Sequence, residues 1–360
     1  MDFLAEFFAN ANTFVTLLFF AFGLICIIKG GDWFVDSASW IAEVLGVPKF
    51  VIGATIVSIA TTLPEMIVSV AATLSGNVEM AAGNAIGSVT ANTAMIMGLL
   101  IICIPAAVKR KEFAPKAIIM IGASIAIFLG CVFTETKEAT FSGETGIFHN
   151  LSTAGLVALV IIFITFFIEN FVSLKNSETQ IEPSPEGIGI QTEDGVVPTK
   201  ETATKKDWIH NLIFFALGAI GIVVGAQLLV NAGTELAGRI GIPQRVISVI
   251  AIAIGTSLPE LVTAITAIRK KEGALSVGNI LGANIIDLTL ILPICSFVSM
   301  AQNNGALAVS YSSVHVDMVV CFAAIAITLI PTIITKKFSR WQGILSLTGY
   351  LAYVLATFIG

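Results

Sequence analysis

The sequence predicts an all-α polytopic membrane protein with ten transmembrane helices in two inverted-topology five-helix repeats. Three observations carry this prediction. The 360 residues are 56% hydrophobic and only 12% charged, a composition far from that of soluble domains. Apolar windows long enough to cross a bilayer recur along the chain. One motif occurs twice, once in each half of the chain and 195 positions apart.

Windows of about 20 apolar residues, the length that crosses a bilayer core, define the ten predicted helices. They fall at 11–28, 50–74, 80–106, 114–134, 151–173, 209–232, 246–268, 274–299, 315–335 and 341–359. The first window lacks the basic flank and the cleavage site of a signal peptide, so we expect it to remain as a helix. The chain therefore divides into a first repeat half at 1–173, a polar linker at 174–207 and a second repeat half at 208–360.

Lysine and arginine placement predicts the orientation, because these residues favour cytoplasmic loops. With the amino terminus outside, 16 of the 19 basic residues would lie in cytoplasmic loops or at their edges, Lys116 among them. The linker would then be cytoplasmic and both termini extracytoplasmic. Arg269-Lys270-Lys271 follows one copy of the motif, whereas the equivalent Leu74-Ser75-Gly76 is uncharged. The two equivalent loops are thus expected on opposite sides of the membrane, as in the inverted repeats of secondary transporters.

The recurring motif places a carboxylate inside an apolar window. Its copies are Ala60-Thr61-Thr62-Leu63-Pro64-Glu65 and Gly255-Thr256-Ser257-Leu258-Pro259-Glu260. A charge at bilayer depth costs roughly 2.5–3.5 kcal/mol on insertion scales, so it normally faces a partner or a water-filled cavity. Pro259 has no N–H and crowds the carbonyl of Gly255, so we expect the helix to open there and expose main-chain oxygens. Hydroxyl, carbonyl and carboxylate oxygens together suit Na⁺ or Ca²⁺.

A second block repeats in the same register on the next apolar window. Gly83-Asn84-Ala85-Ile86-Gly87-Ser88-Val89-Thr90-Ala91-Asn92 pairs with Gly278-Asn279-Ile280-Leu281-Gly282-Ala283-Asn284-Ile285-Ile286-Asp287. Asn92 therefore corresponds to Asp287. Each half gains a second oxygen ligand from this pair.

These paired motifs resemble the two alpha repeats of the cation/calcium exchanger superfamily, most closely its prokaryotic sodium/calcium exchangers. The resemblance spans nearly the whole chain. It implies a secondary-active antiporter, not an enzyme, that exchanges Ca²⁺ for Na⁺ by alternating access at a midplane carboxylate site. The first and sixth helices would slide as a gate. It further implies no cofactor, a monomer whose partners are the lipid bilayer, Ca²⁺ and Na⁺ and not nucleic acid, and a place in the cell (inner) membrane of a prokaryote.

The resemblance also assigns the ligands of the transported ions. Glu65 and Glu260 would bridge the central cation, with Asp287 and Asn92 beside them. The remaining ligands would be the hydroxyls of Thr62, Ser257 and Ser88 and the main-chain carbonyls of Thr61, Thr256, Ser58 and Ala253.

Three departures from the family pattern bear on the substrate. Ala60 stands where glycine is usual, Thr62 replaces serine but keeps the oxygen, and Ala283 replaces a serine and so removes a candidate Na⁺ ligand. Val89 also stands where asparagine is common. An H⁺-coupled or K⁺-dependent cation antiporter of the same fold is therefore the alternative, because carboxylates can also be neutralised by protons. A passive channel and an intramembrane hydrolase are further alternatives. The hydrolase motifs HExxH and YD with GxGD are absent from the sequence.

Histidine and cysteine spacing offers no second site. His149, His210 and His315 are expected in loops or at helix ends, and the His315-Val316-Asp317 stretch favours an interfacial surface feature over a metal site. The five cysteines lie in apolar windows without metal-type spacing. We expect them to be packed thiols.

Overall fold

The computed structural model describes residues 2–76, 78–105, 109–141, 144–178, 191–192, 195–196, 203–240, 257–302 and 305–359. The chain forms two compact units. The first unit comprises Met1–Lys49 and Asn176–Glu272, and the second comprises Phe50–Lys175 and Gly273–Gly360. Each unit combines segments of both sequence halves. The two compact units therefore do not coincide with the predicted repeat halves at 1–173 and 208–360, and the division into repeats stays a prediction.

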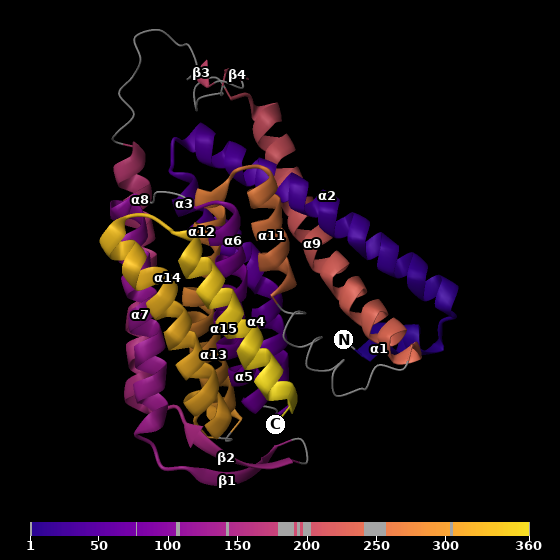
Figure 1. Ribbon diagram of the computed structural model, residues 1–360, viewed down its shortest axis with the longest axis vertical. Helices are drawn as coiled ribbons and strands as arrows, with labels where there is room; N and C mark the ends of the chain where they lie inside the picture. The colour runs from indigo at the N-terminus through magenta and orange to yellow at the C-terminus, as the bar shows by residue number, and fades with distance from the viewer. Residues whose placement is uncertain are drawn as a thin grey trace. The chain divides into compact units, whose positions relative to one another are not determined.

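Two long helices that lie side by side dominate the first unit (Figure 1). Its elements are α1 (Asp2–Asn10), α2 (Thr13–Leu45), β3 (Gln191–Thr192), β4 (Gly195–Val196), α9 (Lys205–Arg239) and α11 (Leu258–Arg269). The backbones of α2 and α9 touch where glycines face each other. A Cβ atom on Gly30 would lie 2.9 Å from the carbonyl oxygen of Gly218, and one on Gly218 only 2.7 Å from Phe34 N. Small residues permit this close approach between membrane helices.

Helix α2 is much longer than the window 11–28 that predicted it. Its 33 residues extend about 50 Å at 1.5 Å per residue, beyond a hydrocarbon core of about 30 Å. The window ended at polar residues that the helix nevertheless includes. Lys270, just after α11, has its Nζ atom 2.6 Å from Asp36 and 3.6 Å from Asp32 of α2. These ion pairs connect the end of α11 to the polar stretch of α2.

The second unit is a larger helical bundle with a small sheet (Figure 1). Its first-half elements are α3 (Lys49–Ile52), η1 (Gly53–Val57), α4 (Ser58–Leu74), α5 (Val78–Ala91), η2 (Asn92–Ile96), α6 (Met97–Cys103), α7 (Arg110–Val132), β1 (Lys137–Phe141), β2 (Glu144–Asn150) and α8 (Thr153–Glu178). Its second-half elements are α12 (Gly273–Ile286), η3 (Asp287–Ile291), α13 (Leu292–Ala301), β5 (Ala308–Ser310), η4 (Ser313–Asp317), α14 (Met318–Thr335) and α15 (Arg340–Ile359). The η elements are π-helical turns.

Helix α12 packs directly on the π-helical turn η1. A Cβ atom on Gly278 would lie 2.1 Å from the carbonyl oxygen of Phe50, and one on Gly282 would lie 2.7 Å from that of Ala54. Only glycine fits at either position, and the four-residue spacing puts both on one helix face. The repeated glycine block of the second half therefore serves as a packing surface for the segment that leads into the first carboxylate motif.

The helix boundaries repeat in the register that the duplicated motifs predict. Helices α5 and α12 each have 14 residues and begin 195 positions apart. The turns η2 and η3 follow them at once, starting at Asn92 and Asp287. Helices α4 and α11 also end at equivalent residues, Leu74 and Arg269. The duplication therefore extends from the sequence to the secondary structure.

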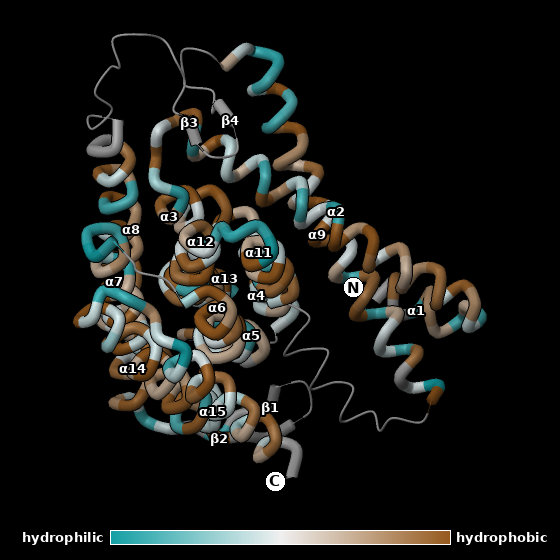
Figure 2. The backbone as a smooth tube through the Cα atoms, turned by 45° about the horizontal axis from the view of Figure 1, so that its top comes forward, coloured by the Kyte–Doolittle hydropathy of each residue, from teal (hydrophilic) through white to brown (hydrophobic). Residues whose placement is uncertain are grey.

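Among the described residues, eight helices are long and apolar enough to cross a membrane. They are Thr13–Leu45, Lys49–Leu74, Met80–Cys103, Arg110–Val132, Thr153–Leu174, Lys205–Leu236, Gly273–Ala301 and Ser313–Thr335. Figure 2 shows that hydrophobic residues dominate most of these helices. Helix α15 has 20 residues but is not among the eight, and α11 is described only from Leu258 onward. The count of ten stays a prediction.

The purely helical prediction overlooked a small antiparallel sheet in the order β1-β2-β5. Strand β2 pairs with β5 so that His149 lies opposite Val309. The strands come from short polar connections between apolar windows, where hydropathy carries no strand signal. The prediction of packed thiols also needs a correction, since Cys103 is exposed at the end of α6 while Cys131, Cys295 and Cys321 are buried.

Candidate ion-binding site

Helix α4 turns a polar face inward. Its buried residues are Ser58, Thr61, Thr62, Glu65, Ser69, Ala72 and Thr73, which recur at helical spacing along one face. The opposite face exposes large apolar side chains, among them Ile59 and Ile67. This pattern is the reverse of that in a soluble amphipathic helix. It is expected of a membrane helix that lines a polar site in the protein interior.

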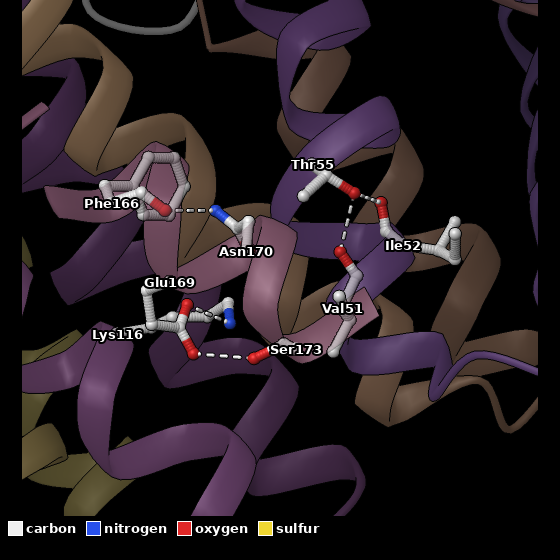
Figure 3. Close-up of polar contacts among 8 residues, drawn as sticks. All are labelled: Val51, Ile52, Thr55, Lys116, Phe166, Glu169, Asn170 and Ser173. Carbon is white, nitrogen blue, oxygen red and sulfur yellow. Dashed lines mark hydrogen bonds and ion pairs between the residues drawn. The ribbon is translucent and has the colours of Figure 1, made fainter. Parts of the chain in front are cut away.

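Pro64 lies within the continuous helix α4. The irregular backbone instead comes about two to three turns earlier, in the π-helical turn η1 at Gly53–Val57. There Thr55 donates its hydroxyl to the carbonyl oxygens of Val51, at 2.7 Å, and Ile52, at 3.3 Å (Figure 3). π-Helical turns of this kind are frequent at functional sites. The opening that we expected beside the second motif proline, at Gly255, lies outside the described residues.

Hydrogen bonding distinguishes the two threonines of the first motif. The Thr61 hydroxyl donates to Asn279 Oδ1 of α12 at 3.1 Å and lies 3.3 Å from the carbonyl oxygen of Ser58. Thr62 Oγ1 is just as buried but has no hydrogen-bond partner among the described residues. The Thr61 hydroxyl is thus engaged in hydrogen bonds within the protein. The Thr62 oxygen remains available to another partner, and its assignment as a hydroxyl ligand stays a prediction.

Asn92 and Asp287 occupy equivalent places at the start of η2 and η3. Both side chains are completely buried. In the part of the chain that the structure describes, neither the oxygen nor the nitrogen of the Asn92 amide has a hydrogen-bond partner. An unpartnered buried polar group costs about 1–3 kcal/mol, and the role of Asn92 as an ion ligand stays a prediction.

The elements that carry these side chains contact one another within the second unit. Helix α4 packs against α5, α12 and η3, α5 packs against η3, and α12 packs against η2. Seven of the predicted ligands lie on these elements and are buried: Ser58, Thr61, Thr62, Glu65, Ser88, Asn92 and Asp287. The fold therefore gathers two carboxylates, an amide and several hydroxyls on neighbouring helices, without a basic residue among them.

The second motif lies on α11 of the first unit. Ser257 is the N-cap residue, Pro259 stands in the first turn, where its missing N–H costs nothing, and Glu260 follows. Ser257 and Glu260 are both buried. Thr256 and Ala253 lie outside the described residues. The prediction that Glu260 meets Glu65 around one cation stays a prediction.

Sequence analysis overlooked one polar contact next to the predicted ligands. Asn284 of α12 donates from Nδ2 to Thr93 Oγ1 of η2 at 2.9 Å, and both residues are buried. This bond joins the neighbours of Asn92 and Asp287. The signal was present in the repeat, because Asn284 corresponds to Val89 and has no polar counterpart in the first half.

A buried ion pair was also unexpected. Lys116, predicted to face the cytoplasm, is fully buried in α7, with its Nζ atom 2.6 Å from Glu169 Oε2 of α8. Figure 3 shows the two side chains pointing toward one another, with Ser173 donating to the other carboxylate oxygen at 2.9 Å. Lys116 also lies 5.6 Å from the ring centre of Phe50. The pair links α7 and α8 to the segment that precedes η1.

Several apolar spans together with buried oxygen ligands on neighbouring helices define a multi-pass integral membrane protein of the transporter class. The model of the sodium/calcium exchanger protein family matches residues 15–178 and 210–359. The chain therefore belongs to the sodium/calcium exchanger family.

Two relatives from archaea are similar over nearly their whole length. An uncharacterized membrane protein of Methanocaldococcus jannaschii is 30% identical over 346 residues, which are 95% of this chain and 98% of the relative. Sodium/calcium exchanger MaX1 of Methanosarcina acetivorans is 29% identical over 352 residues, with 96% and 99% covered. A solved structure of the sodium-calcium exchanger NCX_Mj, soaked with Na⁺ and Sr²⁺, superposes with a TM-score of 0.72 at 26% identity and covers 96% of this chain and 99% of that one.

Proposed function

We propose that the protein is a secondary-active antiporter that exchanges Ca²⁺ for Na⁺ by alternating access at a midplane site built around Glu65 and Glu260. The observation that carries this proposal is the buried polar face of α4, where Glu65 follows Thr62 with its unpartnered hydroxyl. The packing of Asn92 and Asp287 on neighbouring elements supports it. The names of the exchangers to which the chain is similar supply the choice of ions.

Coupling follows from the cost of an empty site. Glu65, Glu260 and Asp287 are each fully buried, and taking an ionised carboxylate out of water costs several kcal/mol. A transporter that seals these groups from water must therefore carry positive charge with them. One Ca²⁺ or a group of Na⁺ ions neutralises the cluster, whereas the empty carrier cannot change sides. Exchange, and not leak, is the expected result.

The proposed architecture has ten transmembrane helices in two inverted repeats, 1–173 and 208–360, joined by a cytoplasmic linker at 174–207. Both termini are extracytoplasmic, and the protein acts as a monomer in a prokaryotic cell membrane. The matching boundaries of α5–η2 and α12–η3 support the repeat. The glycine-mediated pairing of α2 with α9 supports their movement as a single gate.

One observation favours a second candidate, an H⁺-coupled antiporter of the same fold. Ala283 of α12 is fully buried, while the equivalent Ser88 offers a hydroxyl. The second half thus lacks one oxygen that would bind Na⁺. Protons need no such ligand, because they neutralise carboxylates directly.

Flux measurements in liposomes with purified protein separate the two candidates. Uptake of radioactive calcium is followed with an outward gradient of Na⁺, K⁺ or H⁺ imposed one at a time. Our proposal predicts uptake with the Na⁺ gradient and background uptake with the others. Uptake that follows the pH gradient alone would establish the second candidate, and calcium flux without any counter-ion would show a channel.

A further inference from the structure

Two of the three histidines of the chain meet beside the small sheet of the second unit, at its lower end in Figure 1. His149 belongs to strand β2 and His315 to the π-helical turn η4. Their ring centres are 5.2 Å apart although 166 positions separate them in the chain. The sequence favoured a surface feature at His315 because nothing in it indicated His149 as a neighbour.

Three rings cluster at this place. The Tyr311 ring stacks on His315 with ring centres 3.9 Å apart. His149 lies 5.2 Å from His315 and 5.8 Å from Tyr311. The two imidazole planes are tilted by 31° relative to each other.

The separation also fits a shared ion. Zinc lies about 2.0–2.1 Å from each imidazole nitrogen in a tetrahedral site, which puts the two ring centres roughly 5 Å apart. The observed distance between the two ring centres, 5.2 Å, matches this separation.

Hydrogen bonds to the backbone set the tautomer of both rings. His149 Nδ1 is 3.3 Å from the carbonyl oxygen of Thr134, and His315 Nδ1 is 3.1 Å from that of Tyr311. A carbonyl oxygen only accepts, so each Nδ1 carries the hydrogen and each Nε2 keeps its lone pair. Metal-binding histidines almost always have this second hydrogen bond, which orients the ring.

The His149 Nε2 atom is otherwise unexplained. The side chain is 97% buried, as its exposed fraction is 3%. Over the described ranges of the chain, no hydrogen-bond partner reaches Nε2. A buried acceptor without a partner costs about 1–3 kcal/mol. The adjacent His315 lies on a π-helical turn, a feature frequent at functional sites.

We propose that His149 and His315 form a site for a divalent transition-metal ion such as Zn²⁺, which both Nε2 atoms would bind. The structure describes no group of three or more His, Cys, Asp or Glu side chains arranged around an ion. The protein thus supplies two ligands of the metal ion, and water molecules supply the others. Imidazole nitrogen selects Zn²⁺, Cu²⁺ or Ni²⁺, whereas Ca²⁺ and Na⁺ require oxygen. This site is chemically distinct from the carboxylate site.

A metal ion here would fasten strand β2 to η4. That turn contacts α5, where Thr90 Oγ1 lies 3.5 Å from the carbonyl oxygen of Asp317. Thr90 is two residues from Asn92. The site is therefore attached to α5, which carries the predicted ligand Ser88 and leads directly into η2 with Asn92.

Calorimetric titration of the purified full-length protein with Zn²⁺, in excess Ca²⁺, tests the proposal. Excess Ca²⁺ fills the carboxylate site, so the remaining Zn²⁺ binding reports the histidines. We expect one Zn²⁺ per chain, at least tenfold weaker binding in His149→Gln and in His315→Gln, and unchanged binding in His210→Gln. His210 is the matched control because it lies on α9 of the other unit, stacked on Phe214.

Binding of Cu²⁺ to the native protein provides a second test, which does not require any variant to fold. The electron paramagnetic resonance spectrum of the Cu²⁺-loaded native protein should show coupling to two imidazole nitrogens. Zn²⁺ affinity unchanged in His315→Gln, no Zn²⁺ binding by the native protein, or a copper spectrum with only oxygen ligands would each overturn the proposal. In Glu65→Gln, loss of calcium flux with Zn²⁺ binding intact would show that the two sites are independent.

Discussion

The hydroxyl of Thr61 donates a hydrogen bond to Asn279 Oδ1 over 3.1 Å, joining the carboxylate motif of the first half to the glycine block of the second. The residues are 218 positions apart, and both are buried. This bond fixes the face of α4 relative to α12. It therefore holds the Thr61 carbonyl, the Thr62 hydroxyl and Glu65 in place without being part of the ion shell.

Removal of the Thr61 hydroxyl should destabilise the fold. Thr61→Val keeps the shape but leaves Asn279 Oδ1 buried without its donor, at a cost of about 1–3 kcal/mol. We expect a lower thermal unfolding midpoint in detergent. Thr61→Ser keeps the hydroxyl and is the control, with a midpoint near that of the native protein. Equal midpoints for Thr61→Val and the native protein would show that the bond has no structural role.

Removal of the neighbouring hydroxyl should act on ion binding instead. Thr62→Val deletes an oxygen that forms no hydrogen bond with any described residue, so the thermal unfolding midpoint should be maintained. The Na⁺ concentration for half-maximal exchange should rise roughly threefold to tenfold, as expected for about 1 kcal/mol. The Ca²⁺ requirement should change less, because carboxylates dominate its binding. The restored Na⁺ affinity of Thr62→Ser is the check, and a loss of stability in Thr62→Val would contradict this assignment.

The buried ion pair of Lys116 and Glu169 should be costly to break. Lys116→Met leaves the Glu169 carboxylate, whose side chain is 18% exposed, without its partner. We expect a loss of about 2 kcal/mol, below the 3–5 kcal/mol of fully buried pairs because of that exposure. The double variant Lys116→Met/Glu169→Leu should recover most of the stability, since an apolar pair replaces the ionic one. A single variant as stable as the native protein would refute this view of the pair.

Glycine in α12 should be irreplaceable where it touches η1. In Gly278→Ala the new Cβ would lie 2.1 Å from the carbonyl oxygen of Phe50, so the helices must separate, at about 1–3 kcal/mol. Gly122→Ala in α7 is the matched control, because no atom lies within 4 Å of the added Cβ. That change should be neutral or stabilising, since alanine favours a helix by up to about 1 kcal/mol. Equal effects on the unfolding midpoint would exclude close packing as the cause.

The duplicated sequence predicted much of the candidate site. Register alone paired Asn92 with Asp287, and the structure places both at the start of matching π-helical turns. The hydroxyl and carboxylate spacing of the first motif likewise predicted the buried face of α4. These features follow from helical periodicity and intramembrane charge, which a sequence shows directly.

Other features depend on contacts that a sequence does not show. The π-helical turns insert a residue without changing hydropathy, so η1 and η4 had no signal. Lys116 was read as a loop cation because Glu169, its partner, lies 53 positions away. Helix α2 continued past its window because hydropathy marks only the apolar part of a helix, whereas α2 runs on through polar residues to Leu45.

Calcium uptake by liposomes under an outward Na⁺ gradient tests the central claim, that Glu65 and Glu260 act on one transported ion. Each carboxylate is buried and is expected to supply charge that no other ligand replaces. Glu65→Gln and Glu260→Gln should each reduce uptake to background while the folded protein remains, and Glu6→Gln, at an exposed position of α1, should leave uptake unchanged. Near-normal uptake in either of the two motif variants would contradict the account.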